Sequence, residues 1–160
     1  MKADPLITYR RKPATLDTRS LESFAEVLRD RVARTREFHC RITNDAELQS
    51  LNKRFRGKDY PTDVLSFPTE RDIAISLQRA RAQAKQWGHK AEDEIRILML
   101  HGVLHLQGMD HETDNGAMKR AEQRWRQKLG LPTSLVERTV AQALVPAAPA
   151  LMPAPGALKK

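Results

Sequence analysis

The chain has 160 residues, which is enough for one compact domain with an apolar core and too short for two independent domains. Hydrophobic residues make up 40% of it and charged residues 30%, a balance that excludes a fibrous or wholly disordered protein. The formal net charge of +8 is concentrated in residues 1–58, where 14 Lys and Arg outnumber 8 Asp and Glu. A basic surface of this kind attracts RNA or DNA, although many basic proteins bind neither.

Signals for export, membrane insertion or disulfide bonding are missing from the sequence. Residues 1–13 lack the apolar core of a signal peptide, and the longest apolar run in the body, residues 97–100, is far too short to cross a bilayer. Cys40 is the single cysteine, so the chain can form neither an intramolecular disulfide nor a cysteine zinc site. We therefore expect a cytoplasmic protein with no membrane partner.

The first part of the chain alternates strand and helix patterns. Residues 5–9 predict a short strand, and residues 16–32 predict a helix because their apolar positions recur at helical spacing. Residues 37–43 alternate between apolar and polar side chains, which is typical of a half-buried strand and places His39 on its polar face. The Asn44-Asp45 pair predicts the start of an amphipathic helix over residues 45–56.

The second part predicts a hairpin followed by helices. Its segments, in chain order, are two strands at residues 63–67 and 72–77, a polar helix at 76–87, a central helix at 91–107, a further helix at 112–129 and a short one at 135–144. The central helix is so apolar in its second half that it must be buried. Residues 145–160 contain four prolines and predict a disordered tail.

This mixture of strands and helices favours an α+β fold over a doubly wound parallel sheet. We expect a single domain over residues 1–144, in which helices pack on a small mixed β-sheet and the central helix is buried. The histidines of that helix, described next, make it the predicted metal-binding helix.

Three of the five histidines fall within eleven residues, in the pattern HxxxHxxGxxH. His101 and His105 are four residues apart, about 40° in projection around a helix, so both rings point the same way. Gly108 allows the chain to reverse after the helix, so that His111 can supply a third nitrogen. Three imidazoles leave one open position on a tetrahedral metal ion, which is typical of catalytic zinc sites.

Two alternatives to a metal hydrolase are open at this point. The histidines could be core residues satisfied by backbone or carboxylate partners, although burying three polar rings on an apolar helix is costly unless something ligates them. The spacing also matches that of metzincin proteases, but Gly102 stands where those enzymes place a general-base glutamate. A glycine in mid-helix further indicates close approach of another segment or of substrate. Asp110 could accept a ligand N–H or serve only the turn.

Three blocks of the sequence carry a family resemblance. They are HGVLHLQGMDH at residues 101–111, LNKRFRGKDYPTDVLSFP at residues 51–68 and DIAIS at residues 72–76. In these blocks and their spacing, which span roughly residues 40–130, the chain resembles the bacterial YbeY family of metal-dependent endoribonucleases, which are rRNA maturation factors. The resemblance implies one zinc ion per chain, bound by His101, His105 and His111.

The resemblance also implies a functional arginine at Arg56, which would join the three histidines as the catalytic set and face the metal across a basic cleft. A guanidinium there could hold a phosphodiester by two hydrogen bonds and stabilise charge that develops on its oxygens. Judged from the residues alone, Arg56 could also be a cation that complements the dipole of its helix. Lys58 could add affinity for phosphate or be an ordinary surface lysine. Arg71 stands where the family usually has a glycine, which we expect to alter one edge of the cleft.

The function that the resemblance implies is single-strand-specific endoribonuclease activity in 16S rRNA 3′-end maturation and in ribosome quality control. The substrate would be a ribosomal RNA precursor, with the ribosome as partner, and the sequence leaves open whether water or the RNA 2′-hydroxyl attacks phosphorus. The second hypothesis is an RNA-binding or ribosome-binding assembly factor with a chiefly structural metal, because no general base is evident. A metallopeptidase ranks third because of Gly102.

Overall fold

The computed structural model describes residues 4–110 and 115–132. In chain order, the elements of this part are β1 (Ile7–Tyr9), α1 (Thr18–Val27), a π-helical turn η1 (Leu28–Val32), β2 (His39–Thr43), α2 (Asp45–Arg56), β3 (Val64–Phe67), β4 (Asp72–Ser76), α3 (Leu77–Trp87), α4 (Ala91–Leu106) and α5 (Ala117–Leu129). His111, the helix predicted at 135–144, the predicted domain limit at 144 and the predicted tail at 145–160 lie outside the described residues. In the part that is described, no helix combines the length and the apolar character needed to cross a bilayer.

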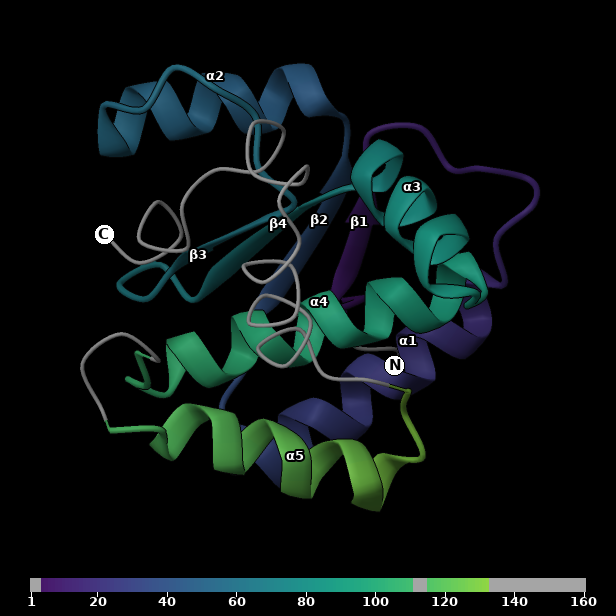
Figure 1. Cartoon of the computed structure of the whole chain (residues 1–160), viewed down its shortest axis with the longest axis vertical. Coiled ribbons are helices and arrows are strands. Elements are labelled where there is room, and N and C mark those ends of the chain that lie inside the picture. The colour runs from purple at the N-terminus through teal and green to yellow at the C-terminus, as the bar shows by residue number, and fades with distance from the viewer. Residues whose placement is uncertain (1–3, 111–114, 133–160) are drawn as a thin grey trace.

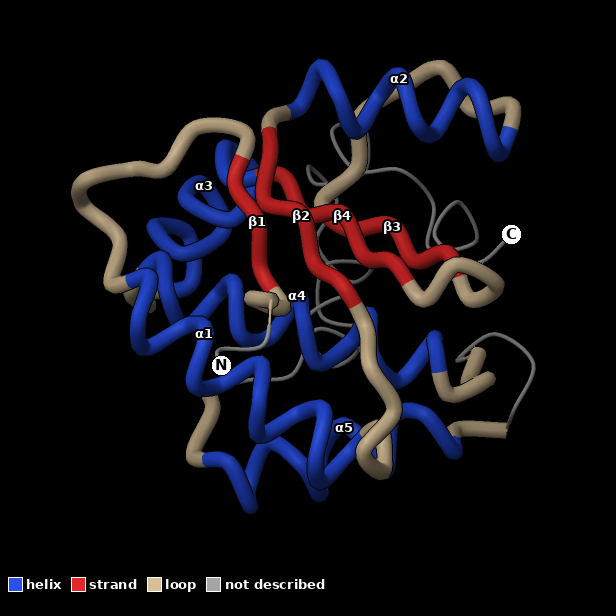
Figure 2. The backbone as a smooth tube through the Cα atoms, turned by 180° about the vertical axis from the view of Figure 1, so that it is seen from behind, coloured by secondary structure: helices blue, strands red, loops and turns tan. Residues whose placement is uncertain are grey.

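The four strands form one mixed sheet in the order β1-β2-β4-β3 (Figure 2). Neighbours β1, β2 and β4 run parallel, while β3 runs antiparallel to β4 at the edge of the sheet. Cys40 of β2 lies opposite Ile7 of β1 and Ile73 of β4, so these side chains share one face. Each strand lies inside its predicted range, and the predicted hairpin and the α+β class are both confirmed.

The sheet has helices on both faces (Figures 1 and 2). On one face its aliphatic side chains join a large core with α1, α3 and α4. On the other face α2 packs through a small cluster around Leu48 and Leu65 and is the one described helix there. α5 contacts α4 and lies on the side of α4 away from the sheet. The buried position predicted for the central helix is therefore confirmed, because α4 lies between the sheet and α5.

Gly102 of α4 lies close against Ile73 of β4. A Cβ atom at residue 102 would lie 2.9 Å from both Cδ1 and Cγ2 of Ile73. The close approach predicted for this glycine is confirmed, and the segment that approaches is β4. Nearby, the hydroxyl of Ser66 in β3 donates a hydrogen bond to the Gly102 carbonyl at 3.3 Å, which adds a second link between α4 and the hairpin.

The boundaries of α2 agree with the prediction, whereas the start of α5 does not. Asn44 caps α2 by accepting a hydrogen bond from the Glu47 amide at 2.9 Å. The helix predicted to start at residue 112 begins only at Ala117, because Asn115 and Gly116 have φ angles of 55° and 85°. Those positive φ angles are incompatible with a right-handed helix, so the predicted start was wrong.

Arg71 ties the β3–β4 turn to the end of the central helix. Its backbone has a φ of 60°, a conformation that glycine adopts more readily than any other residue. Its guanidinium donates from Nη1 to the Leu106 carbonyl at 3.2 Å and to Oε1 of Gln107 at 3.3 Å, and from Nε to the Glu37 carbonyl at 3.1 Å. The arginine therefore satisfies a carbonyl at the C-terminus of α4 and fixes the turn against it.

Candidate metal centre

His101 and His105 lie together in the second half of α4, where both are buried. Their Nε2 atoms are 3.1 Å apart, and the ring planes meet at 75°. Two imidazole nitrogens that bind one tetrahedral zinc ion at 2.0–2.1 Å are separated by about 3.3 Å. The two rings therefore present their nitrogens at nearly the spacing of two adjacent ligands.

The third predicted ligand, His111, lies outside the described residues and stays a prediction. Within residues 4–110 and 115–132, no group of three or more His, Cys, Asp or Glu side chains could hold a metal ion. The donor set of His101 and His105 nevertheless fits zinc, because imidazole is one of its preferred ligands and two rings with facing nitrogens are half of a tetrahedral site.

Glu122 of α5 is a functional candidate that the sequence analysis missed. Its Oε1 atom pairs with Nδ1 of His101, and both side chains are 1% exposed. A carboxylate bound to the remote nitrogen of a metal-binding histidine is the usual arrangement at zinc sites. The sequence did contain a signal for this residue. Glu122 follows Ala121 and lies four residues after Met118, which places an acidic side chain on the apolar face of α5. The corresponding role suggested for Asp110 stays a prediction.

Arg56 ends α2 and points its charge into a shielded environment. All three of its guanidinium nitrogens are inaccessible to solvent and lack a hydrogen-bond partner among the described residues. Burial lowers the pKa of this guanidinium, because a charged group loses solvation there. A shielded cation with unused donors is costly unless an anion binds to it. Within the described residues, it makes no hydrogen bond to the carbonyls at the end of α2.

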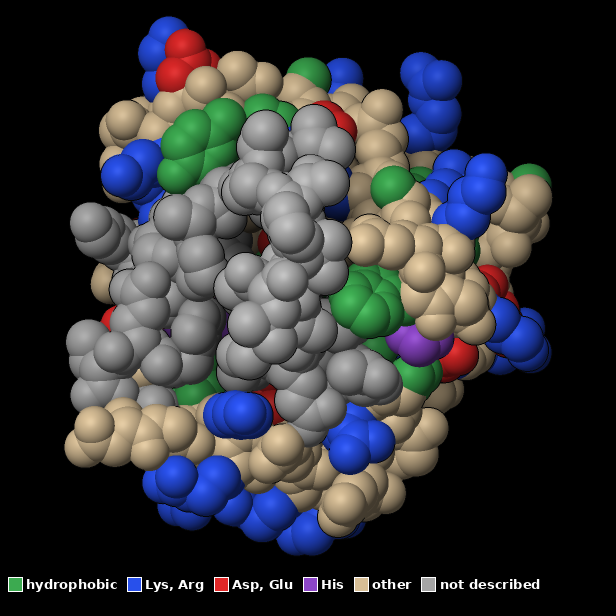
Figure 3. Space-filling view, in the orientation of Figure 1, with side chains coloured by type: hydrophobic (Ala, Val, Ile, Leu, Met, Phe, Trp, Pro, Cys, Tyr) green, Lys and Arg blue, Asp and Glu red, His purple; other side chains and the backbone are tan. Residues whose placement is uncertain are grey.

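The ends of α2 and α4 lie on the same side of the molecule, with the β3–β4 turn between them (Figures 1 and 2). This arrangement brings the segment of Arg56 and the end of the histidine helix to the β3 edge of the sheet. Lys58, two residues after Arg56, is half-buried and has no ion pair in the described part of the chain. In the orientation of Figure 1, Lys and Arg side chains occur around much of the described surface (Figure 3).

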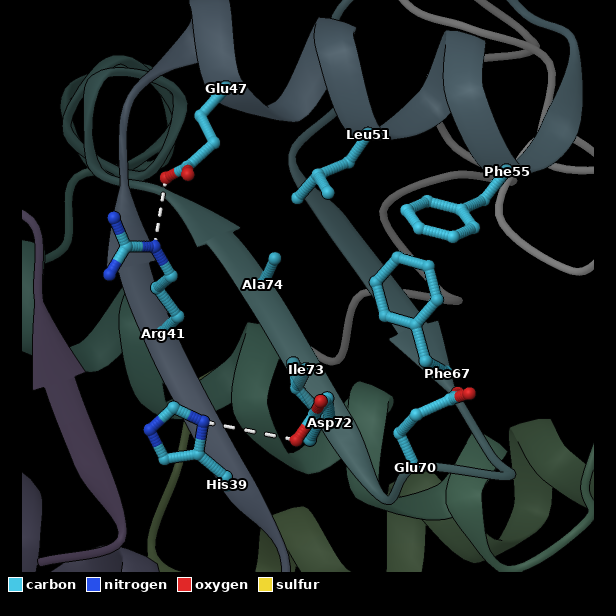
Figure 4. A pocket seen from close by; sticks show the side chains of 10 residues that line it. All are labelled: His39, Arg41, Glu47, Leu51, Phe55, Phe67, Glu70, Asp72, Ile73 and Ala74. Carbon is cyan, nitrogen blue, oxygen red and sulfur yellow. Dashed lines mark hydrogen bonds and ion pairs between the residues drawn. The ribbon is translucent and has the colours of Figure 1, made fainter.

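A separate groove of about 360 Å³ lies on the other face of the sheet, beneath α2 (Figure 4). Phe55 and Phe67 line its apolar end, with ring centroids 5.5 Å apart. His39 and Asp72 lie at its polar end, 3.8 Å apart between Nδ1 and Oδ1. The position predicted for His39, on the polar face of its strand, is confirmed. The groove is distinct from the histidine pair, because α4 packs on the opposite face.

Comparison with known proteins assigns the chain to a family. A family model described as endoribonuclease YbeY matches residues 7–130. The protein named endoribonuclease YbeY from Solibacter usitatus is 59% identical over 136 residues, which cover 82% of this chain and 92% of that protein. The protein of the same name from Koribacter versatilis is 45% identical over 139 residues, covering 84% and 91%.

A solved structure agrees with this assignment. The solution structure of TM1509 from Thermotoga maritima has a TM-score of 0.51 and 26% sequence identity, and the match covers 74% of this chain and 85% of that one. The family model spans more than half of the chain, and the relatives match over most of their own length. The chain therefore belongs to the YbeY family of endoribonucleases.

Proposed function

We propose that this endoribonuclease is zinc-dependent and single-strand-specific, and that it acts in 16S rRNA 3′-end maturation and in ribosome quality control. Its substrate would be a ribosomal RNA precursor in the cytoplasm, and the ribosome would be its partner. The observation that carries the metal dependence is the pair of buried Nε2 atoms of His101 and His105, 3.1 Å apart. We infer one zinc ion per chain, with His111 as its third ligand.

Each residue of the proposed site would have its own role. The histidines would hold the metal, which when bound supplies a Lewis acid for phosphodiester hydrolysis. Arg56 would bind the scissile phosphate by two hydrogen bonds, since its donors are shielded from solvent and make no hydrogen bond to any residue that the structure describes. Its fixed positive charge would stabilise the negative charge that develops on the phosphate oxygens. Lys58 would add affinity for a neighbouring phosphate.

Cleavage of a short single-stranded RNA by the purified full chain tests this proposal. Chelator treatment, His105→Ala and Arg56→Ala should each lower the rate by about 100-fold or more, since loss of one group that stabilises developing charge has this effect. The same RNA in a duplex, and DNA of the same sequence, should be poor substrates.

Matched control variants separate the site from general charge and fold effects. Arg54→Ala removes a cation from the same turn of α2 and leaves Arg56 in place, because Arg54 is exposed and lies over the Phe55 ring. His39→Ala removes a histidine from the other face of the sheet. Both should keep nearly full activity. Undiminished cleavage after chelation and in both site variants would refute the zinc-dependent mechanism.

The assembly-factor hypothesis has one structural observation in its favour, which is the burial of His101 and His105. Structural metals occupy such closed positions and stabilise the fold directly. Thermal unfolding with and without chelator discriminates between the two, because strong stabilisation by metal without turnover of RNA supports the assembly factor. The peptidase hypothesis has no such support, because Gly102 packs on Ile73 and supplies no carboxylate.

A further inference from the structure

Glu122 is the one acidic residue of α5, and it lies on the face of the helix that packs against α4. Its neighbours on that face, Met118 and Ala121, are apolar and buried. A carboxylate removed from water in such surroundings is destabilising unless a specific partner compensates for it. Its pairing with Nδ1 of His101 supplies that partner, so the position of Glu122 is tied to the histidine pair.

The contact with Glu122 favours a proton on Nδ1 of His101. An ionised carboxylate accepts hydrogen bonds and donates none, so the ring form of His101 that can pair with it has its proton on Nδ1. In a neutral ring with the proton on Nδ1, the lone pair is on Nε2, and this atom is the one that faces Nε2 of His105 at 3.1 Å. The pairing therefore aims a metal-binding lone pair at the point where the two rings meet.

Glu122 also supplies charge. Two neutral imidazoles carry no net charge, whereas the carboxylate behind His101 adds a negative charge that solvent screens weakly, because both side chains are 1% exposed. A divalent cation is attracted by that charge, and the hydrogen bond raises the basicity of the ligand nitrogen.

We propose that Glu122 is a positioning residue, which holds His101 as the Nδ1–H tautomer and prepares the histidine pair to bind a metal ion. This inference rests on the proposed metal site but makes its own claim about the protein before metal binds. A merely structural Glu122 would fasten α5 to α4 and have no effect on ring protonation. Glu122→Gln keeps the shape and an acceptor oxygen without the charge, and Glu122→Ala removes both.

Two measurements on the full chain test the proposal. Titration with Zn²⁺, and with Co²⁺ for its visible spectrum, should show affinity lowered by about 10- to 100-fold in Glu122→Ala and by less in Glu122→Gln. Nitrogen NMR of the histidine rings in the metal-free protein should show His101 protonated at Nδ1 in the unchanged chain. In Glu122→Ala the same ring should move toward the Nε2–H form.

Asp63→Asn is the matched control, because Asp63 is also a buried carboxylate, and its Oδ2 accepts from the Gln83 amide at 3.0 Å, away from the histidines. It should lower stability and leave metal affinity and the His101 tautomer unchanged. If Glu122→Ala behaves like this control, the positioning role is overturned. Should Glu122→Ala fail to fold, the same comparison is made with the conservative Glu122→Gln variant, and unchanged metal affinity and tautomer there overturn the role. If the unchanged chain binds no metal, the proposed function fails, while the NMR result still decides the role of Glu122.

Discussion

Gly102→Ala tests how closely the central helix packs on the sheet. The added methyl group would lie 2.9 Å from Cδ1 and Cγ2 of Ile73 and 3.1 Å from its Cγ1. Ile73 is 1% exposed and β-branched, so its side chain cannot rotate away without disturbing the core. Overpacking of this kind costs about 1–3 kcal/mol. Alanine in place of glycine within a helix contributes about 1 kcal/mol of stability in the opposite sense. We therefore expect a net loss of roughly 1 kcal/mol in the free energy of unfolding.

The Ile73→Ala background reverses the expected sign. This substitution removes all three atoms that the new methyl group would meet, and by itself it costs about 2–5 kcal/mol because it leaves a cavity. Gly102→Ala added to it should increase stability by up to about 1 kcal/mol, since only the helix preference remains. The effect of Gly102→Ala on the free energy of unfolding should therefore differ by about 2 kcal/mol between the two backgrounds, and this difference is the coupling energy of the double-mutant cycle.

Urea unfolding of the four proteins, followed by circular dichroism, measures both effects. A loss of 1 kcal/mol should lower the thermal midpoint by about 4 °C in a domain of this size, so thermal scans give a second reading. The steric reasoning is refuted if Gly102→Ala stabilises the unchanged chain, or if its effect is the same in both backgrounds.

Three further outcomes follow from the structure. Arg71→Ala should be less stable than Arg71→Gly by about 1 kcal/mol in urea unfolding, because both lose the hydrogen bond to Leu106 and only glycine also relieves the φ of 60°; equal stabilities would argue against backbone strain. Burial raises the pKa of Tyr9 to about 12 from 10.0. In a Tyr60→Phe variant, tyrosinate absorbance should therefore rise near pH 12. The stability that protonated Tyr9 contributes is present below pH 10 and should be lost as the pH approaches 12. A midpoint of the absorbance change near pH 10 would contradict this. Cys40 is fully buried and burial raises the pKa of its thiol, so thiol reagents should label it only on unfolding, and rapid labelling of the folded protein would contradict its burial.

Local features of the fold follow from the sequence. The start of α2 was predictable because Asn44 is a standard N-cap residue that bonds an amide only three residues later. The late start of α5 also has a local cause, because Asn115-Gly116 is a turn-forming pair. The prediction followed the helical periodicity of residues 112–129 and gave this pair too little weight. Hydrogen bonds and steric preferences between near neighbours decide both positions.

The sequence by itself determined that His101 and His105 share a helix face, because the helical repeat places residues four apart in register, and its motifs led to the correct family. The tertiary structure alone revealed that Glu122 meets His101 and that the Arg71 guanidinium reaches the Leu106 carbonyl. Those partners are 21 and 35 residues apart in the chain. Such pairs form only when helices and turns from distant segments pack around one core. The periodicity of a single segment shows which of its faces is buried but does not identify the segment that packs on it.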